Sequence, residues 1–261
     1  MKKTMSFLLA LALLVSAAPR ARAVSALPDA GVPVLMYHSI SAKYDPSFCV
    51  PPAQFERELR YLREHDFHSI SPSELRAALA DGEPLPENPV LITFDDGFGD
   101  NYKTAWPILK KYGFRATFFI VTSNVGDYSI DWPQLRELAD AGNTIGSHTV
   151  RHCNLATLSA DGQRKELFDS KQTLEDRLGV PVTAFCIPYG KYNKTTLELL
   201  REAGYDISFT TDSGRVCTGD ELYTLRRIHM VGGTSAERFA KKVAGCGETG
   251  EKDCAFPPET L

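Results

Sequence analysis

The sequence predicts an α/β protein with one domain, in which a mainly parallel sheet closes into a distorted or incomplete β/α barrel. The 261 residues are 43% hydrophobic and 24% charged, a composition ordinary for a globular protein and unlike that of disordered, collagen-like or coiled-coil chains. Short apolar segments alternate with amphipathic helical segments along the chain, as in serial β/α units. Seven or eight such units in a chain of this length, without an interdomain linker, favour a barrel over an open sheet.

Each predicted strand is a short apolar run, and each predicted helix has apolar residues at helical spacing. The second helix, for instance, begins with Ser71 as cap and with Glu74 in position to close a capping box. Glycine ends later helices, at Gly142, Gly179 and Gly204. We predict strands at 32–37, 67–70, 90–94, 116–121, 144–147, 182–187, 206–210 and 224–230. We predict helices at 54–64, 71–81, 101–111, 133–141, 159–178, 194–203 and 235–244.

Residues 1–23 have the order of a secretory signal peptide: two lysines, a short apolar run, then small residues. We expect cleavage after Ala23, with Ala18 as the second choice. The apolar run is shorter than the ~20 residues that span a bilayer, and an uncleaved anchor is the alternative. The mature protein, a domain over 24–245 followed by a tail over 246–261, would then be secreted or periplasmic, without stable membrane insertion.

The net charge limits the possible binding partners, and the cysteine content bears on the compartment in which the protein acts. Residues 1–23 contain four basic and no acidic residues, so the net charge of the remaining chain is −8 against −4 for the whole. An acidic body without a Lys/Arg cluster argues against nucleic acid as a partner. Six cysteines in an exported protein permit up to three disulfides. Cys246 and Cys254 bracket a polar loop that could close locally, and burial as small apolar side chains is the alternative for several others.

Two adjacent carboxylates, Asp95 and Asp96, directly follow the apolar strand predicted at 90–94. Such a pair is costly at the end of a buried strand unless it is paired or bound to a metal. Because neighbouring side chains leave an extended chain in opposite directions, the two carboxylates should meet different surroundings. One can then bind a cation while the other remains a free base. An ordinary Asp-Asp-Gly turn is the alternative.

Two histidines, His148 and His152, follow the strand predicted at 144–147. Imidazoles four residues apart on one side of a turn or helix can chelate one divalent ion, although His-x-x-x-His alone also arises by coincidence. Together with the Asp95–Asp96 pair they supply a His, His, Asp set that leaves coordination positions open to water. A catalytic metal site requires such open positions.

A third group, Pro188, Tyr189 and Gly190, follows the strand predicted at 182–187. Proline fixes the backbone and glycine permits a tight turn, so the Tyr189 N–H could be presented to a ligand. A plain turn is the alternative. All three groups lie at the C-terminal ends of predicted strands, where β/α barrels hold their catalytic residues.

Taken in order, the segments 93–97 (TFDDG), 147–152 (SHTVRH) and 188–190 (PYG) resemble the motifs of the polysaccharide deacetylases of carbohydrate esterase family 4, also called the NodB homology domain. The likeness extends over about 32–229. The opening VLMYH at 34–38 further resembles the branch that removes acetyl groups from poly-β-1,6-N-acetylglucosamine during biofilm exopolysaccharide export. The resemblance implies a distorted (β/α)7 barrel, a divalent metal that is usually zinc, and N-acetylated glycan substrates.

The resemblance also implies a role for each matching residue. The metal ligands would be Asp96, His148 and His152. Asp95 would be the general base that takes a proton from the attacking water. The Tyr189 N–H, in the turn with Pro188, would share the developing oxyanion with the metal. Zinc is the first choice of metal, and cobalt, nickel, iron and manganese are the alternatives.

Amide hydrolysis also needs a general acid, since the leaving amine must be protonated. His38 lies at the C-terminal end of the first strand, and in the exopolysaccharide branch the matching histidine is thought to serve as this acid. His229, near the last strand, lies where other branches place theirs. We expect His38 to be the acid and His229 to be a half-buried strand residue.

Cys186 departs from the family pattern. Many members have an arginine two residues before the Pro-Tyr pair, where it orients the catalytic aspartate, and we expect that an exposed thiol at the strand end could not do this. We hypothesise that Arg227, from the last strand, makes this contact with Asp95. Cys153, next to His152, could join a disulfide that braces the metal loop, or be an additional ligand.

The function predicted from the sequence is a metal-dependent hydrolase that removes N-acetyl groups from an exported or cell-envelope polysaccharide, with poly-β-1,6-N-acetylglucosamine as the expected type. Chitin oligomers, peptidoglycan and acetylated xylan are alternative substrates. A weakly active carbohydrate-binding protein is the alternative from another class, but such a module would not need a base, three ligands and an acid. A glycosidase that pairs Asp95 with Asp96 is disfavoured, because its two carboxyls must face each other ~5–9 Å apart.

Overall fold

The computed structural model describes residues 27–126 and 128–245. Its strands are β1 (Val34–Tyr37), β2 (His68–Ser69), β3 (Pro89–Phe94), β4 (Thr117–Ile120), β5 (Thr144–Ser147), β6 (Ala184–Cys186), β7 (Ile207–Ser213) and β8 (Leu225–His229). Its α-helices are α1 (Pro52–Glu64), α2 (Pro72–Ala80), α3 (Trp106–Tyr112), α4 (Trp132–Asp140), α5 (Ala160–Leu178), α6 (Lys194–Glu202) and α7 (Ala236–Ala244). Shorter helical turns are η1 (Asn101–Ala105), η2 (Thr122–Asn124), η3 (Leu155–Thr157) and η4 (Pro188–Gly190). The predicted signal peptide and tail, with Cys246 and Cys254, lie outside the described residues, so the domain boundaries stay predictions.

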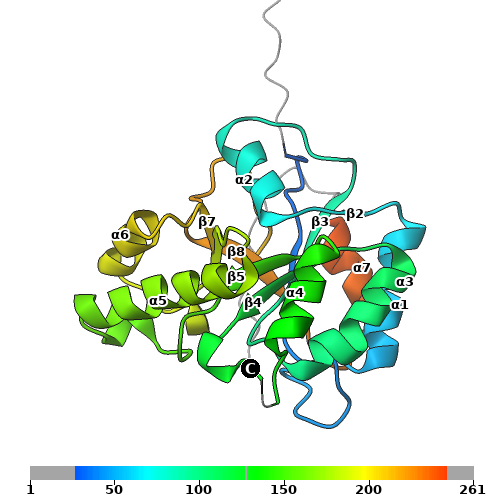
Figure 1. Ribbon diagram of the computed structural model, residues 1–261. Coiled ribbons are helices and arrows are strands. Elements are labelled where there is room, and N and C mark those ends of the chain that lie inside the picture. Colours follow the sequence, from blue (N-terminus) through cyan, green and yellow to red (C-terminus); the bar gives the residue numbers. More distant parts are fainter. Residues whose placement is uncertain (1–26, 127, 246–261) are drawn as a thin grey trace, which may run out of the picture.

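Seven of the strands close into a barrel (Figure 1). In the ring order β1, β3, β4, β5, β6, β7, β8 every neighbouring pair is parallel, and β1 closes the ring by pairing with both β3 and β8. Strand β2 lies outside the ring and pairs with the start of β3. The ring is uneven, because a single register pair joins β5 to β6 and no helix lies between β7 and β8. The predicted distorted, incomplete (β/α)7 barrel is therefore confirmed.

The strands separate two apolar clusters, one between the barrel and the surrounding helices and one inside the barrel. On β3, Ile92 and Phe94 belong to the outer cluster, whereas Leu91 belongs to the inner one. Because side chains alternate along a strand, Thr93 and Asp95 continue the inner row of β3. The chain thus carries a carboxylate into the barrel interior at the C-terminal end of this strand.

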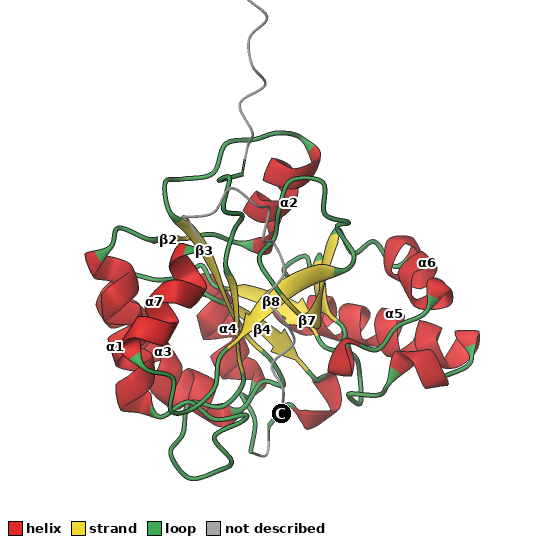
Figure 2. Ribbon diagram, turned by 180° about the vertical axis from the view of Figure 1, so that it is seen from behind, coloured by secondary structure: helices red, strands yellow, loops and turns green. Residues whose placement is uncertain are grey.

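The two ends of the barrel differ. Helix α2 covers the N-terminal end, and its Leu75 and Ala78 join the inner apolar cluster. The capping box predicted for this helix is present, with Ser71 and Glu74 exchanging hydrogen bonds. The loops that follow β1 and β4 lie at the opposite end in both views (Figures 1 and 2). Polar side chains therefore reach the interior from the C-terminal end, as in other β/α barrels.

No helix within residues 27–126 and 128–245 is long and apolar enough to cross a membrane.

Candidate active site

The C-terminal ends of four barrel strands bring the sequence motifs together. Asp95 and Asp96 directly follow β3, and His148 directly follows β5. Cys186 is the last residue of β6, and Arg227 lies within β8. Segments that are far apart in the sequence thus meet at one end of the barrel.

The first cluster at this end joins Asp96 to the two predicted histidines. Asp96 Oδ1 lies 3.5 Å from His148 Nε2 and 3.3 Å from His152 Nε2, and one ligand atom from each residue lies within 4.8 Å of the others. The backbone of Asp96 (φ 69°) and of His152 (φ 56°) is left-handed, which is costly for residues other than glycine. These turns direct the carboxylate and the second imidazole toward the same point.

The pKa values in this cluster favour two neutral imidazoles beside a carboxyl group that ionises less readily than an ordinary aspartate. Burial, followed by the neighbouring charge of Asp95, raises the pKa of Asp96 to about 7. Burial lowers the pKa of His148 to about 3 and also lowers that of His152. Neutral imidazole nitrogens are the form in which histidine binds divalent ions.

The outer nitrogen of each imidazole has a partner. His148 Nδ1 lies 2.7 Å from the carbonyl oxygen of Cys186, and His152 Nδ1 lies 3.0 Å from the hydroxyl of Tyr189. Both contacts leave Nε2 directed toward Asp96. Metal-binding histidines are commonly held in this way by partners on the nitrogen that does not bind the metal.

The second cluster holds Asp95 inside the barrel. Arg227, which is fully buried, forms a bidentate ion pair with this carboxylate, with Nη1–Oδ1 at 2.8 Å and Nη2–Oδ2 at 2.7 Å. The guanidinium also donates to the carbonyl oxygen of Thr210 at 2.9 Å, to Thr93 Oγ1 at 3.0 Å and to Cys186 Sγ at 3.0 Å. All donors of the guanidinium therefore have an acceptor, which fixes its orientation.

The ion pair controls the charge of Asp95. Burial alone would raise the pKa of this carboxyl, but the Arg227 guanidinium outweighs burial and holds the pKa well below its ordinary range. Asp95 is therefore ionised across the physiological pH range, while the adjacent Asp96 has a raised pKa. The two neighbouring carboxylates meet different surroundings, as the alternation of side chains along β3 predicts.

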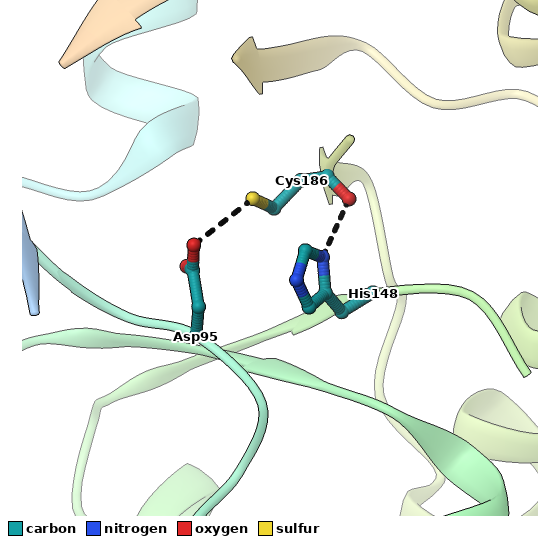
Figure 3. Close-up of side chains that lie close together, drawn as sticks. All are labelled: Asp95, His148 and Cys186. Atoms are coloured by element: carbon teal, nitrogen blue, oxygen red, sulfur yellow. Dashed lines mark hydrogen bonds between the residues drawn. The ribbon is translucent and has the colours of Figure 1, made fainter. Parts of the chain in front are cut away.

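Asp95, His148 and Cys186 form a second group with metal-ligating atoms in reach of one another (Figure 3). Cys186 Sγ lies 3.4 Å from Asp95 Oδ2, yet both oxygens of Asp95 already accept from Arg227. Burial also raises the pKa of Cys186 well above its ordinary value, so the thiol keeps its proton. A guanidinium and a protonated thiol make this group a poor cation site.

The expectation of an exposed thiol at the end of β6 is wrong. Cys186 is fully buried, because it belongs to the row of β6 side chains that points into the barrel, and it contacts both Asp95 and Arg227. The disulfide considered for Cys153 is also absent, since Cys49, Cys153 and Cys186 are free thiols and only Cys217 among the described residues is disulfide-bonded.

The two candidate acids lie side by side, and the ring centroids of His38 and His229 are 5.8 Å apart. The exposed ring of Phe48 packs edge-on against His38 at 5.8 Å. Asn101, fully buried, donates from Nδ2 to the carbonyl oxygen of His38 at 2.7 Å. Burial lowers the pKa of His38 to about 4, against an opposing contribution from Asp95.

Sequence reasoning missed Glu166, which fixes the loop between the two histidines. Its buried Oε2 accepts from the backbone N–H groups of Val150 and Arg151, both at 2.9 Å, and its Oε1 accepts from Arg151 Nε at 2.7 Å. A signal was present, because Glu166 occurs next to Leu167 on the buried face of α5, where an unpaired carboxylate would be costly.

The protein is a β/α barrel whose charged side chains, including some that could ligate a metal, lie at the C-terminal strand ends, where enzymes of this class hold their active sites. Comparison with known proteins gives the family. A family model described as polysaccharide deacetylase matches residues 82–208. YxkH, a protein of this family from Bacillus subtilis (strain 168), is 36% identical over 211 residues, which cover 80% of this chain and 75% of YxkH. The chain therefore belongs to the polysaccharide deacetylase family and is a deacetylase.

Two further relatives refine the comparison. The structure of the Streptococcus pyogenes deacetylase PplD in complex with acetate superposes with a TM-score of 0.78 at 31% identity, covering 82% of this chain and 98% of PplD. The poly-β-1,6-N-acetyl-D-glucosamine N-deacetylase of Escherichia coli (strain K12) is 27% identical over 262 residues and covers 83% of this chain. The match spans only 39% of that longer relative.

Proposed function

We propose that this deacetylase is a metal-dependent hydrolase that removes N-acetyl groups from an exported or cell-envelope polysaccharide of the poly-β-1,6-N-acetylglucosamine type. The observation that carries the proposal is the shared position of Asp96 Oδ1, 3.5 Å from His148 Nε2 and 3.3 Å from His152 Nε2. The neighbouring carboxylate of Asp95 is ionised and is paired with Arg227.

The donor set fits a divalent ion. Ligand atoms bound ~2.0–2.1 Å from one tetrahedral zinc ion lie ~3.3–3.4 Å from each other, and the two separations from Asp96 Oδ1 agree with this value. Two imidazoles and one carboxylate are typical ligands of catalytic zinc, so zinc is the proposed metal. Held by Asp96, His148 and His152, such an ion would polarise the acetyl carbonyl and make water acidic enough to attack it.

Asp95 would act as the general base. Its carboxylate is ionised, and Arg227 holds it in one orientation by donating to both oxygens. Arg227 is itself oriented by a hydrogen bond to Thr93. A base fixed in this way can accept the proton of the attacking water without first reorienting. We therefore assign Arg227 as the residue that positions Asp95, in place of the arginine that many relatives have at position 186.

The turn after β6 would bind the acetyl oxygen. Tyr189 has left-handed backbone (φ 57°), and Pro188 before it is buried. We propose that this turn presents the Tyr189 N–H to the oxyanion as the tetrahedral intermediate forms. A backbone donor aimed at the position of the oxyanion stabilises the charge that develops there in the transition state.

His38 would protonate the leaving amine. It follows β1 at the C-terminal end of the barrel, and Asn101 fixes its backbone carbonyl. Because burial lowers the pKa of His38 to about 4, its ring is neutral in the resting protein and must gain a proton during the reaction. We propose that the source is the proton that Asp95 takes from water, since the Asp95 charge favours the protonated ring.

The substrate assignment is supported by the name of the E. coli relative at 27% identity and by the VLMYH segment at 34–38. The export assignment is supported by the signal-like order of residues 1–23. A secreted or periplasmic enzyme would meet its glycan after the polymer has left the cytoplasm. The domain would then extend over 24–245, with 246–261 as a tail.

The test is acetate release from four substrates: poly-β-1,6-N-acetylglucosamine, chitin oligomers, peptidoglycan and acetylated xylan. We expect the first to be the best substrate, activity to be lost with a chelator, and zinc to restore it. Asp95→Asn is the inactive control that separates catalysis from contaminating esterase. Chelator-resistant acetate release would contradict the metal dependence, and a clear preference for another glycan would contradict the substrate assignment.

A further inference from the structure

The two imidazoles of the proposed metal site differ in what holds their outer nitrogen. His148 is buried and its Nδ1 faces a backbone carbonyl, that of Cys186. His152 is partly exposed, and its Nδ1 lies 3.0 Å from the side-chain hydroxyl of Tyr189. A carbonyl can only accept a hydrogen bond, whereas a hydroxyl can accept or donate. The tautomer of His152 therefore depends on a side chain.

The contact between Tyr189 and His152 is fixed on both sides by backbone geometry. Both residues have left-handed φ angles, 57° for Tyr189 and 56° for His152. The following Gly190 also has positive φ (62°), and a Cβ atom there would lie 2.3 Å from Thr211 Oγ1. The two rings pack with centroids 4.5 Å apart and planes inclined by 62°. Tyr189 nevertheless remains 56% exposed, so its side chain is not needed to fill the core.

Binding of a cation through His152 Nε2 requires that the ring proton sits on Nδ1. The Nδ1–H group then donates to the Tyr189 oxygen, which accepts. In water alone, a partly exposed imidazole would exchange between its two tautomers and turn about its side-chain bonds. A fixed acceptor removes that freedom before the cation arrives.

We propose that the Tyr189 hydroxyl is a positioning group of the metal site, which holds the His152 ring in the tautomer and orientation that offer Nε2 as a ligand. This inference rests on the proposed metal site and adds to it. The same residue then serves through two different groups, its backbone N–H toward the acetyl oxygen and its hydroxyl toward the metal ligand. The left-handed turn at Tyr189 is what directs the two groups to one place.

The test compares zinc affinity of the full chain and of Tyr189→Phe, which keeps the ring and the backbone N–H and removes only the hydroxyl. Affinity is measured by competition with a chromogenic chelator, and the fold by thermal melting. We expect zinc affinity to fall about 10–100-fold, the usual cost of removing such an outer partner. Tyr128→Phe is the matched control, because Tyr128 is 95% exposed, and it should bind zinc as the unmodified protein does.

A second measurement reads the tautomer directly. Nitrogen-15 NMR of the zinc-loaded protein should show one Nδ1-protonated form of His152, and Tyr189→Phe should broaden or split this signal while His148 stays unchanged. Tyr189→Leu, which also lacks the hydroxyl, should repeat the loss of affinity if the phenylalanine variant folds poorly. Equal zinc affinity in the unmodified protein and both variants would overturn the positioning role alone. Failure of the unmodified protein to bind zinc would overturn the proposed metal site and this inference with it.

Discussion

The two clusters at the C-terminal end of the barrel are built from adjacent residues, Asp95 and Asp96, yet they have opposite characters. The Asp95 cluster is fully buried and internally neutralised, because Arg227 pairs with both carboxylate oxygens. Within residues 27–126 and 128–245, no Lys or Arg side chain forms an ion pair with Asp96, and one oxygen of this carboxylate faces two imidazole nitrogens. The charge of the first cluster is neutralised within the protein, whereas the second cluster offers ligands to the proposed divalent ion.

In the proposed roles, one dipeptide would supply two functions. The alternation of side chains along β3 sends Asp95 into the barrel, and the left-handed turn at Asp96 directs the next carboxylate toward the histidine loop. The pKa values follow the same division, since that of Asp95 is held low by Arg227 and that of Asp96 is raised by burial and by Asp95. Each side can therefore be altered separately.

The largest effect is expected from Asp96→Asn, which removes the charged ligand. Zinc affinity should be lost, and acetate release should fall to the level of a buffer control, because the proposed nucleophile and carbonyl activation both depend on the ion. Zinc content by elemental analysis and acetate release are measured on the same preparation. A variant that still releases acetate at the unmodified rate would show that Asp96 is not a ligand.

Asp95→Asn should separate the two clusters. We expect acetate release to fall about 10²–10⁴-fold, the usual contribution of a general base, with zinc affinity nearly unchanged. Loss of zinc together with activity would mean that Asp95 is itself a ligand, and the comparison between the clusters would not hold. Thermal melting checks the fold, because asparagine still accepts a hydrogen bond from Arg227 but no longer compensates the buried positive charge of Arg227.

Arg227→Ala should lower both kcat and the free energy of unfolding. Removing one partner of a buried ion pair leaves the other charge uncompensated, so the free energy of unfolding should fall by ~3–5 kcal/mol. A misplaced base should lower kcat by up to ~10²-fold. The matched control is Arg226→Ala, since Arg226 forms a partly exposed ion pair with Asp220 at 3.7 Å, worth at most ~1 kcal/mol. A kcat within about twofold of the unmodified enzyme in Arg227→Ala would end its positioning role.

The smallest effect is expected from a substitution of Glu58. The carboxylate of this buried residue accepts hydrogen bonds from Tyr37 and Gln54, both at 2.8 Å. Burial raises its pKa from 4.5 to about 7, so its contribution to stability is fully present below pH 4.5 and is lost as the pH rises through 7. At ~1.4 kcal/mol per pKa unit, the loss is on the order of 3 kcal/mol.

Glu58→Gln should remove this pH dependence, giving a more stable protein than the unmodified chain at pH 8 and a similar one at pH 4.5. Urea unfolding at the two pH values measures the effect. A pH dependence that is the same with glutamine at position 58 would show that another group titrates.

Much of the fold and of the site geometry could be predicted from the sequence, because both follow from local patterns. The apolar runs locate the strands, and β/α barrels place polar residues at the C-terminal strand ends, which singles out Asp95, Asp96 and His148. The separation of the two carboxylates follows from strand alternation alone. The resemblance to a known family then indicated which residues to group.

The features that could not be predicted depend on how deeply a side chain is buried and on how distant segments align in the fold. Cys186 was expected to be exposed because it ends a strand, but the strand places it in the interior row. Glu166 holds the histidine loop from a distant helix, and no spacing rule links it to Val150 or Arg151. The contact of the Tyr189 hydroxyl with His152 has no sequence signal either, because the Pro-Tyr-Gly motif constrains the backbone of the turn and not the direction of the side chain.

The most direct test of the account is an anomalous X-ray diffraction map of zinc-loaded crystals, recorded at the zinc absorption edge. The account predicts one strong peak ~2.0–2.2 Å from a carboxylate oxygen of Asp96 and from the Nε2 atoms of His148 and His152, with Asp95 still paired to Arg227. A peak between Asp95, His148 and Cys186 would contradict it.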